Sequence, residues 1–381
     1  MIKTPMPPKL SKSSRSALAI AVLATISSAA MAQTSVTVYG DIDASVRSTT
    51  NADVNGGRQT SLGNGIFEDS FIGFKGKEDL GGGNTALFDL EAGFGPGNGA
   101  LSNQGQFFGN QAWVGLRNDS LGEIDLGRQY GLAYQTLGVY APLGRGVATS
   151  QGAAPELAWQ TNLFGARFDN TIEYSNSFGP IKGQLQYSAG GVAGATSAGS
   201  TSAAALTYAE GPLSVGGVLQ QSKDANANTM SLWGAGGSFA TGPATLFLSY
   251  FDAKRDPNFS VAANLSGGPL ANTSLMANTN TLLQRSDRVW TTGVAFQATP
   301  AMSYTLGYMH DNVKNDSDLG NSGRVSTVYA VADYSLSKRT DVYAEIDHST
   351  LGGGEVSSDD VLSIPGGSQR TGLAAGLRIK F

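Results

Sequence analysis

The chain contains no cysteine, only two histidines and few charged residues for its length. Of its 381 residues 14% are charged, with 25 lysines and arginines against 30 aspartates and glutamates. Without cysteine there is no disulfide and no zinc–thiolate site. His310 and His348 leave little for a histidine metal cluster or a Ser-His-Asp triad. The acidic balance argues against a nucleic-acid-binding protein. We therefore expect no cofactor, no metal, no nucleic-acid partner and no enzyme activity.

Long apolar runs are also missing, apart from one short run near the beginning of the chain. A basic stretch precedes the apolar residues 17–26 (ALAIAVLATI), and residues 30–32 (AMA) match the A-x-A cleavage pattern of a secretory signal peptide. The run of ten is too short to span a bilayer. We predict a signal peptide over residues 1–32, with cleavage between Ala32 and Gln33.

The predicted mature chain, residues 33–381, is acidic and rich in glycine. The signal peptide holds four basic and no acidic residues, which leaves 21 basic against 30 acidic residues and a net charge of −9. No later stretch reaches the roughly 18 apolar residues of a membrane-spanning helix. The 51 glycines show no collagen period and suit turns and strand interiors. We find no linker, and expect one domain over residues 33–381.

Two segments at the ends of this domain alternate between apolar and polar residues. They are 35–47 (SVTVYGDIDASVR) and 370–381 (RTGLAAGLRIKF). Successive side chains of a strand point to opposite faces, so each segment would have one apolar face and one polar or small face. Two such strands can pair and close a sheet into a barrel with lipid outside and water inside.

Sixteen strand-like runs recur along the domain, and their connections alternate between short turns and long loops. The runs cover residues 35–47, 69–78, 84–94, 107–117, 122–130, 168–175, 181–189, 203–208, 213–222, 230–239, 244–254, 287–297, 302–311, 324–334, 340–348 and 370–381. A soluble sandwich or β-helix also has many short strands, but neither predicts this alternation. We predict an all-β fold, a sixteen-stranded antiparallel transmembrane β-barrel.

Carboxylates occupy one face of several of these strands. Asp89 and Glu91 lie opposite Phe88 and Leu90, and residues 341–347 (DVYAEID) alternate in the same way. A charge facing hydrocarbon costs several kcal/mol, and a dry interior could not hold so many unpaired carboxylates. The pattern therefore predicts a water-filled lumen.

The segment 131–167 is unusually apolar for a long loop. Up to Gly165 its only charges are Arg145 and Glu156, beside many aliphatic and aromatic residues. The apolar side chains of such a loop need to be buried, and the inner wall of the barrel would bury them. We expect it to fold inward and narrow the pore. The alternative is an external loop packed on its neighbours or on another subunit.

Several stretches carry a family resemblance. They are VTVYGDIDA (36–44), FIGFKGKEDLGGGNTALFDLEAGF (71–94), QAWVGLRNDSLGEIDLGRQYG (111–131), NTIEYSN (170–176), YSLSKRTDVYAEID (334–347) and the terminal GLRIKF. With these the chain resembles the general porins of Gram-negative outer membranes, of the β-proteobacterial type. The resemblance implies a homotrimer of sixteen-stranded barrels in outer-membrane lipid, with the third long loop folded inward. It also implies passive diffusion of ions and small hydrophilic solutes.

The resemblance also suggests functional residues. Glu91 matches the acidic constriction position of the family, Arg128 matches a wall arginine, and Arg145 lies in the inward loop. Phe381 would be the signal read by the outer-membrane assembly machinery.

Three positions depart from the family pattern. Phe71 and Asn110 stand where relatives carry arginine, and Asp41 stands where some relatives are basic. The wall has therefore lost positive charge and gained negative charge, which puts the anion preference of some relatives in doubt.

From these charges we predict a pore that weakly prefers cations or is nearly unselective. The predicted lumen residues are Asp41, Asp43, Lys75, Asp89, Glu91, Arg128 and Arg145, and rings of carboxylates favour cations. Three alternatives stay open: a porin selective for one nutrient class, an outer-membrane enzyme, and an adhesin with a plugged lumen.

Overall fold

The computed structural model describes residues 35–103, 105–144, 160–261, 270, 272–278, 281–316, 320–354, 364–365 and 367–381. The predicted signal peptide with Ala32 and Gln33, and the predicted lumen residue Arg145, lie outside these ranges. Among the described residues, no helix is long and apolar enough to cross a membrane.

Strands make up most of the described chain. The strands are β1 (Ser35–Thr49), β2 (Gln59–Asn64), β3 (Phe71–Gly81), β4 (Asn84–Gly93), β5 (Gln111–Asn118), β6 (Gly122–Tyr130), β7 (Arg167–Phe178), β8 (Ile181–Ser188), β9 (Thr201–Glu210), β10 (Leu213–Lys223), β11 (Thr229–Thr241), β12 (Ala244–Arg255), β13 (Arg285–Gln297), β14 (Met302–Lys314), β15 (Ser322–Ser335), β16 (Thr340–Gly353) and β17 (Gln369–Lys380). The short helices α2 (Leu132–Leu137), η1 (Gly138–Tyr140) and α4 (Gln160–Phe164) lie between β6 and β7.

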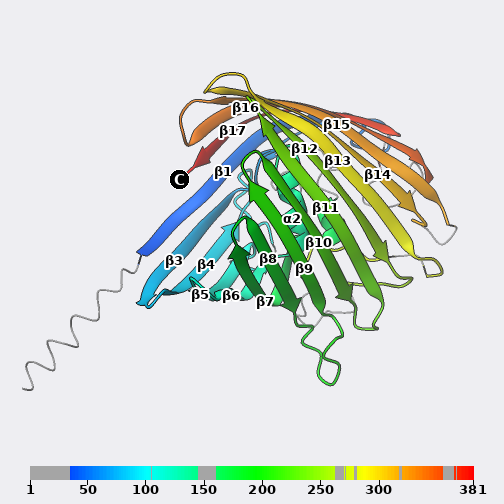
Figure 1. Cartoon of the computed structure of the whole chain (residues 1–381). Coiled ribbons are helices and arrows are strands. Elements are labelled where there is room, and N and C mark those ends of the chain that lie inside the picture. Colours follow the sequence, from blue (N-terminus) through cyan, green and yellow to red (C-terminus); the bar gives the residue numbers. More distant parts are fainter. Residues whose placement is uncertain are drawn as a thin grey trace, which may run out of the picture.

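The sheet closes on itself, as Figure 1 shows. From β3 to β17 each strand pairs antiparallel with the next, and β17 pairs with β1 from Asp41↔Lys380 to Thr49↔Gly372. Residues 35–41 of β1 pair with β3, and residues 44–49 pair with β2. β2 and β3 pair with successive parts of β1 and together fill one strand position of the barrel. The seventeen described strands therefore make a barrel of sixteen strand positions. The predicted sixteen-stranded antiparallel barrel is confirmed.

The strand β2 was not predicted, and it lies in the long connection expected between the runs 35–47 and 69–78. β1 runs further than predicted, to Thr49, and its last residues extend beyond the end of β3. Their free backbone groups need partners, and Gln59–Asn64 supplies them. The short polar sequence QTSLGN carries no apolar alternation that would reveal a strand.

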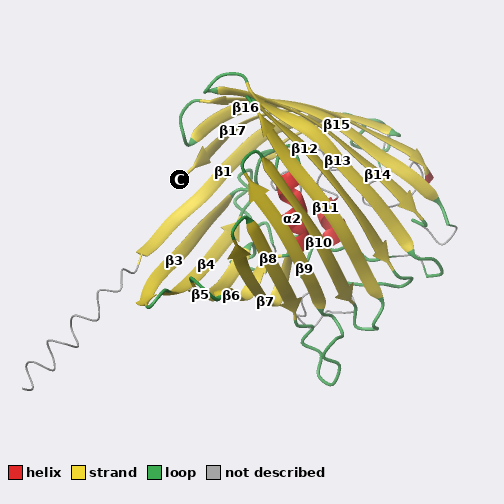
Figure 2. Cartoon of the chain, in the orientation of Figure 1, coloured by secondary structure: helices red, strands yellow, loops and turns green. Residues whose placement is uncertain are grey.

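The connections alternate in length as predicted. Seven turns, after β3, β5, β7, β9, β11, β13 and β15, have two to four residues, whereas the connections at the other end have five to 36 (Figure 2). Three of the short turns repeat the dipeptide Gly-Pro. Their glycines Gly179, Gly211 and Gly242 have φ of 60°, 57° and 56°, a conformation that suits the first position of a two-residue hairpin turn.

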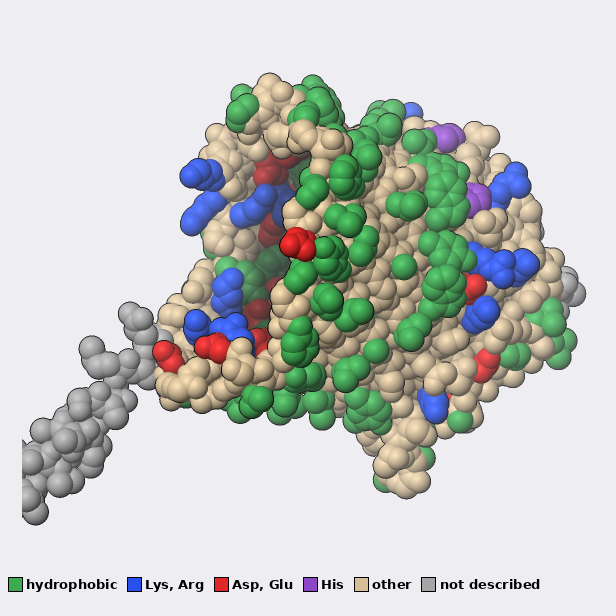
Figure 3. Space-filling view, in the orientation of Figure 1, with side chains coloured by type: hydrophobic (Ala, Val, Ile, Leu, Met, Phe, Trp, Pro, Cys, Tyr) green, Lys and Arg blue, Asp and Glu red, His purple; other side chains and the backbone are tan. Residues whose placement is uncertain are grey.

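The wall has an apolar outside and a polar inside. On β16, Ile346 is 50% exposed on the outer face, while Glu345 on the inner face is 4% exposed. On β17, Leu373, Leu377 and Ile379 are all exposed outward. Figure 3 shows hydrophobic and uncharged side chains over the wall, and acidic and basic side chains within the hollow beside it. This is the predicted arrangement for a barrel with lipid outside.

Candidate functional site: the pore constriction

The described parts of the segment after β6 lie against the inner wall. The first residues of α2 are buried, and the Tyr140 hydroxyl is 3.1 Å from the Ser214 hydroxyl on β10. A Cβ at Gly236 on β11 would lie 2.7 Å from the Tyr140 ring, so small residues of the wall make room for this side chain. Figure 2 shows the helices behind β10 and β11, within the ring of strands.

A group of carboxylates and tyrosines lies on the wall between β1 and β6. The Tyr39 hydroxyl on β1 is 2.6 Å from Asp89 Oδ1 and 3.2 Å from Glu91 Oε2, both on β4. The Tyr130 hydroxyl, at the end of β6, is 3.3 Å from Glu91 Oε1. Lys75 Nζ lies 4.5 Å from the centre of the Tyr39 ring, within cation–π range. The predicted residues Lys75, Asp89 and Glu91 therefore lie together.

Tyr130 joins this acidic group to a cation that the sequence analysis missed. Arg167, the first residue of β7, has its guanidinium carbon 4.8 Å from the centre of the Tyr130 ring. Tyr130 also stacks on Tyr134 of α2, with ring centres 4.8 Å apart. Arg167 Nη2 also donates a hydrogen bond of 3.4 Å to the Tyr130 hydroxyl, which itself donates to Glu91. Glu91 and Arg167 thus approach the same tyrosine.

Arg167 borders a polar cavity of about 270 Å³ although only 7% of its surface is exposed. Arg128, Asn103 and Asn272 also line this cavity. Arg167 forms no ion pair within the described residues, so its charge acts on the cavity and on the neighbouring tyrosine. The sequence could have indicated this residue, because Arg167 is a lone charge at the end of the apolar segment 131–167 and directly precedes the predicted strand 168–175.

Two of the predicted lumen charges have close partners of opposite sign. Asp41 Oδ2 accepts a hydrogen bond of 2.7 Å from Arg378 Nε. Arg128 Nη1 lies 2.7 Å from Asp169 Oδ1, and Arg128 Nε donates to the Gly109 carbonyl at 2.7 Å. Paired charges produce weaker fields in the pore than single ones.

Asp43 lies underneath another segment of the chain. It is fully buried, and Oδ2 accepts hydrogen bonds from the backbone N–H groups of Phe67 and Glu68 at 2.9 and 3.2 Å. Oδ1 accepts one from the Tyr343 hydroxyl at 2.5 Å. Its carboxylate therefore holds the connection between β2 and β3 in place.

Further ion pairs cross the line where the barrel closes. Arg47 on β1 reaches past β17 to β16, where Nη1 is 2.8 Å from Glu345 Oε2 and Nη2 contacts Asp347. All three side chains are buried. We call Arg47, Glu345 and Asp347 the seam triad. Directly after β17, Phe381 exchanges backbone hydrogen bonds of 3.1 Å with Gly40. The role of Phe381 as an assembly signal stays a prediction.

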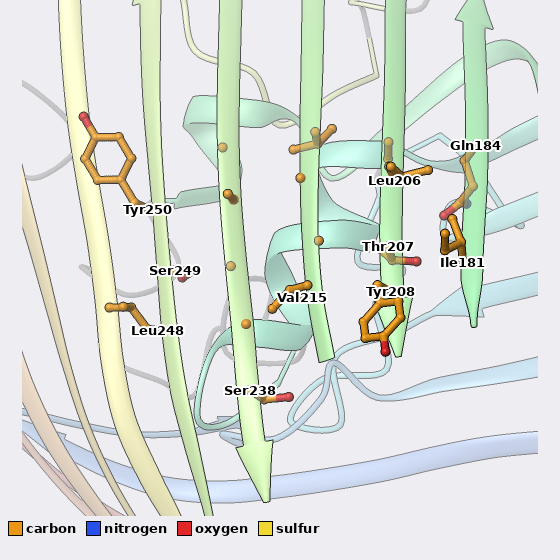
Figure 4. Close-up of a pocket in the computed structure, with 18 of the residues that line it drawn as sticks. Ile181, Gln184, Leu206, Thr207, Tyr208, Val215, Ser238, Leu248, Ser249 and Tyr250 are labelled. Atoms are coloured by element: carbon orange, nitrogen blue, oxygen red, sulfur yellow. The ribbon is translucent and has the colours of Figure 1, made fainter. Parts of the chain in front are cut away.

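A broad apolar concavity of about 1480 Å³ lies on the other side of the wall, over β7 to β13 (Figure 4). Its lining includes Leu206 and Leu248, which are exposed on the outer face. Within the described ranges, no group of three or more His, Cys, Asp or Glu side chains could hold a metal ion. The charged and tyrosine residues inside the barrel are the candidate functional site.

Comparison with known proteins agrees with this architecture. A family model described as Gram-negative porin matches residues 17–354. Outer membrane porin protein 32 of Delftia acidovorans is 28% identical over 395 residues, covering 96% of this chain and 99% of that protein. An outer membrane porin of Bordetella pertussis is 37% identical over 170 residues, which are 41% of this chain and 43% of that protein.

Among solved structures, an anion-selective porin from Comamonas acidovorans aligns with a TM-score of 0.69 and 23% identity. The alignment covers 92% of this chain and all of that one. OmpF of Salmonella typhi aligns with a TM-score of 0.61 and 17% identity, over 91% of this chain and 97% of that one. These two similarities concern the fold, and the family match extends over most of the sequence. The chain belongs to the Gram-negative porin family and is an outer-membrane β-barrel of the channel type.

Proposed function

We propose that this porin is a water-filled channel for passive diffusion of ions and small hydrophilic solutes, narrowed inside the barrel by the segment 131–167. The observation that carries the proposal is the placement of Glu91 and Arg167 at the same tyrosine inside an apolar-coated wall. Opposed charges at a narrow point create a transverse field that acts on dipolar and charged solutes.

Asp89, Glu91, Lys75 and Arg167 are the residues we assign to this field. Lys75 is exposed, and the two carboxylates share the tyrosine hydroxyls. Asp41 and Arg128 contribute less because each has a close partner of opposite charge. Asp43 acts through the backbone that it holds. Arg145, outside the described residues, remains a predicted constriction residue.

We propose a weak preference for cations, or almost no selectivity. Two wall positions that would add positive charge are neutral. The Phe71 ring packs edge-on against Tyr39 at 5.7 Å, and the Asn110 side chain accepts a hydrogen bond of 3.3 Å from Asn103. The solved structure from Comamonas is titled anion-selective, so the two pores would differ in sign.

The experiment is single-channel recording of the purified protein in a planar bilayer, with reversal potentials in a potassium chloride gradient. Stepwise conductance with a potassium-to-chloride permeability ratio at or above one is expected. A clear preference for chloride would overturn the proposed selectivity, and the absence of conductance would overturn the channel. Liposome swelling with neutral solutes of graded size would show whether size alone governs passage.

We further propose that the protein assembles as a homotrimer in outer-membrane lipid after the signal peptide 1–32 is removed. Porins of this family are trimeric channels, and one solved structure with this fold, OmpT of Vibrio cholerae, is titled a trimer form. Three conductance levels per insertion event and a trimer mass in detergent would support this assembly. A monomer mass in mild detergent, with single levels, would contradict it.

A further inference from the structure

The connection Gly65–Ser70, between β2 and β3, folds onto the inner face of the barrel. We call these six residues the β2–β3 clasp. Ile66 is fully buried, and its N–H donates to the Tyr343 hydroxyl on β16 at 3.3 Å. The Phe67 ring packs edge-on against the Tyr343 ring, with ring centres 5.1 Å apart. The guanidinium carbon of Arg378 lies 5.4 Å from the centre of the Phe67 ring. The clasp therefore rests on β16 and β17, inside the pore.

Asp43 of β1 anchors the clasp along its length. Besides the bonds to Phe67 and Glu68, the Gly65 N–H donates to the Asp43 carbonyl at 2.8 Å. The Ser70 hydroxyl accepts from the Asp43 N–H and donates to the Asp43 carbonyl, both at 3.0 Å. Several charge-assisted and backbone hydrogen bonds in a buried place fix one conformation.

Glycine at position 65 is required for this contact. A Cβ there would lie 1.7 Å from Asp43 Oδ1, far inside van der Waals contact, so any other residue would displace the carboxylate. The Asp43 carboxylate occupies the space that a side chain at position 65 would need. Gly65 and Asp43 therefore depend on each other, and the clasp has a defined structure.

The clasp and α2 lie on opposite walls. Around the ring of sixteen positions, β1, β16 and β17 are about half a circumference from β9, β10 and β11. The first three strands carry the clasp, and α2 contacts the other three. Solutes must therefore pass between two inward segments rather than between one segment and a bare wall.

Of the two charged residues of the clasp, Asp69 is buried and Glu68 is the one exposed to this passage. Its backbone N–H is held by Asp43, but its side chain remains partly exposed. Within the described residues its carboxylate has no hydrogen bond and no ion pair. The charged groups that act on it are Asp69 of the clasp, Glu91 of β4, Arg167 of β7 and Arg378 of β17. A single unpaired carboxylate at a narrow point repels anions and attracts cations.

We propose that the β2–β3 clasp is a second constriction element and that Glu68 is a selectivity residue of the pore. This inference rests on the proposed channel function and adds a residue to its selectivity. Glu68 sets part of the preference for cations, and Asp43 positions it.

The test compares Glu68→Gln with Glu210→Gln in planar bilayers. Glu210 is exposed at the β9–β10 turn, so the same chemical change there controls for total charge. We expect Glu68→Gln to lower the potassium-to-chloride permeability ratio by about two-fold at 0.1 M salt, where the Debye length is about 10 Å. The difference should shrink at 1 M salt, and Glu210→Gln should match the wild type.

A second pair of variants tests the anchor. Asp43→Asn weakens the acceptor of the hydrogen bonds from Phe67, Glu68 and Tyr343, whereas Tyr343→Phe removes only the bond from its own hydroxyl. Both changes should loosen the clasp and so raise conductance and current noise, and the effect of Asp43→Asn should be larger. If Asp43→Asn fails to fold, Tyr343→Phe and Glu68→Gln still decide. Equal permeability ratios in wild type and Glu68→Gln would overturn the inference while leaving the channel intact, whereas a wild type without conductance would refute the channel itself.

Discussion

The two inward segments of this porin are held by different forces. The segment after β6 is held by apolar burial, with Leu132, Tyr134 and Phe164 almost fully enclosed. The β2–β3 clasp also buries Ile66, but its backbone is fixed by hydrogen bonds that converge on Asp43. Apolar burial is spread over many contacts and tolerates small changes, whereas an arrangement that depends on one buried carboxylate is lost with that group. On the proposed function, the pore is narrowed by one element that tolerates small changes and by one that depends on a single carboxylate.

The largest effect is expected from Tyr134→Ala, which attacks the robust element. Loss of a buried aromatic ring costs about 3–5 kcal/mol of the free energy of unfolding, and this ring also stacks on Tyr130. Urea unfolding in detergent or lipid vesicles, followed by tryptophan fluorescence, measures the loss. Tyr134→Phe keeps the ring and should retain most of the stability, and equal stability of the alanine variant would show that the packing does not hold the segment.

The next effect is expected from Gly65→Ala, which attacks the fragile element. Its Cβ must push the Asp43 carboxylate away and break the hydrogen bonds of the clasp, at a cost of about 1–3 kcal/mol. Gly63→Ala is the matched control, because a Cβ there meets nothing within 4 Å. Conductance should rise in Gly65→Ala only. The same conductance in both variants would mean that the clasp does not narrow the pore.

A smaller effect on ion selectivity is expected from Arg167→Gln. Removing this cation beside Tyr130 should raise the potassium-to-chloride permeability ratio by about two-fold at 0.1 M salt, where fields extend about 10 Å. Arg117→Gln serves as the control, since the Arg117 side chain is 40% exposed and lies 3.8 Å from Glu123. A ratio that stays constant in Arg167→Gln would place the selectivity elsewhere.

The smallest effect is expected from pH. Partial burial, with Asp69 nearby, raises the pKa of Glu68, which lies in the connection between strands, to about 7. Below this pKa the carboxyl is neutral, so the cation preference of the wild type should fall as pH decreases from 8 to 6. Glu68→Gln should lack this part of the pH dependence. Reversal potentials at both pH values measure it, and the same slope in the two proteins would assign the titration to another group.

The barrel was predictable because lipid and water impose a simple pattern on every strand. β6 matches its predicted bounds, Gly122–Tyr130, and the faces of β16 follow the predicted alternation. The apolar segment 131–167 was also recognisable, because its composition is unusual for a loop. These features depend on local sequence and on the alternation of two environments.

The rest could not be predicted, because it depends on strand register. Asp43 meets the backbone of Phe67 and Glu68 only because β1 pairs first with β3 and then with β2. Asp41 finds Arg378 only when β17 closes against β1. Sequence alternation predicts which face a side chain takes, but not which charge on the neighbouring strand it will meet.

The seam triad has a consequence for how long the barrel lasts once it is made. The β1–β17 ladder joins segments far apart in the chain. Such non-local pairings form slowly, so we expect the ladder to close late in assembly. Interactions formed after the rate-limiting step slow the reverse process rather than speed the forward one. Arg47 forms ion pairs across β17 with Glu345 and Asp347. We therefore expect these ion pairs to act mainly on the rate at which the closed barrel opens, and so on its lifetime.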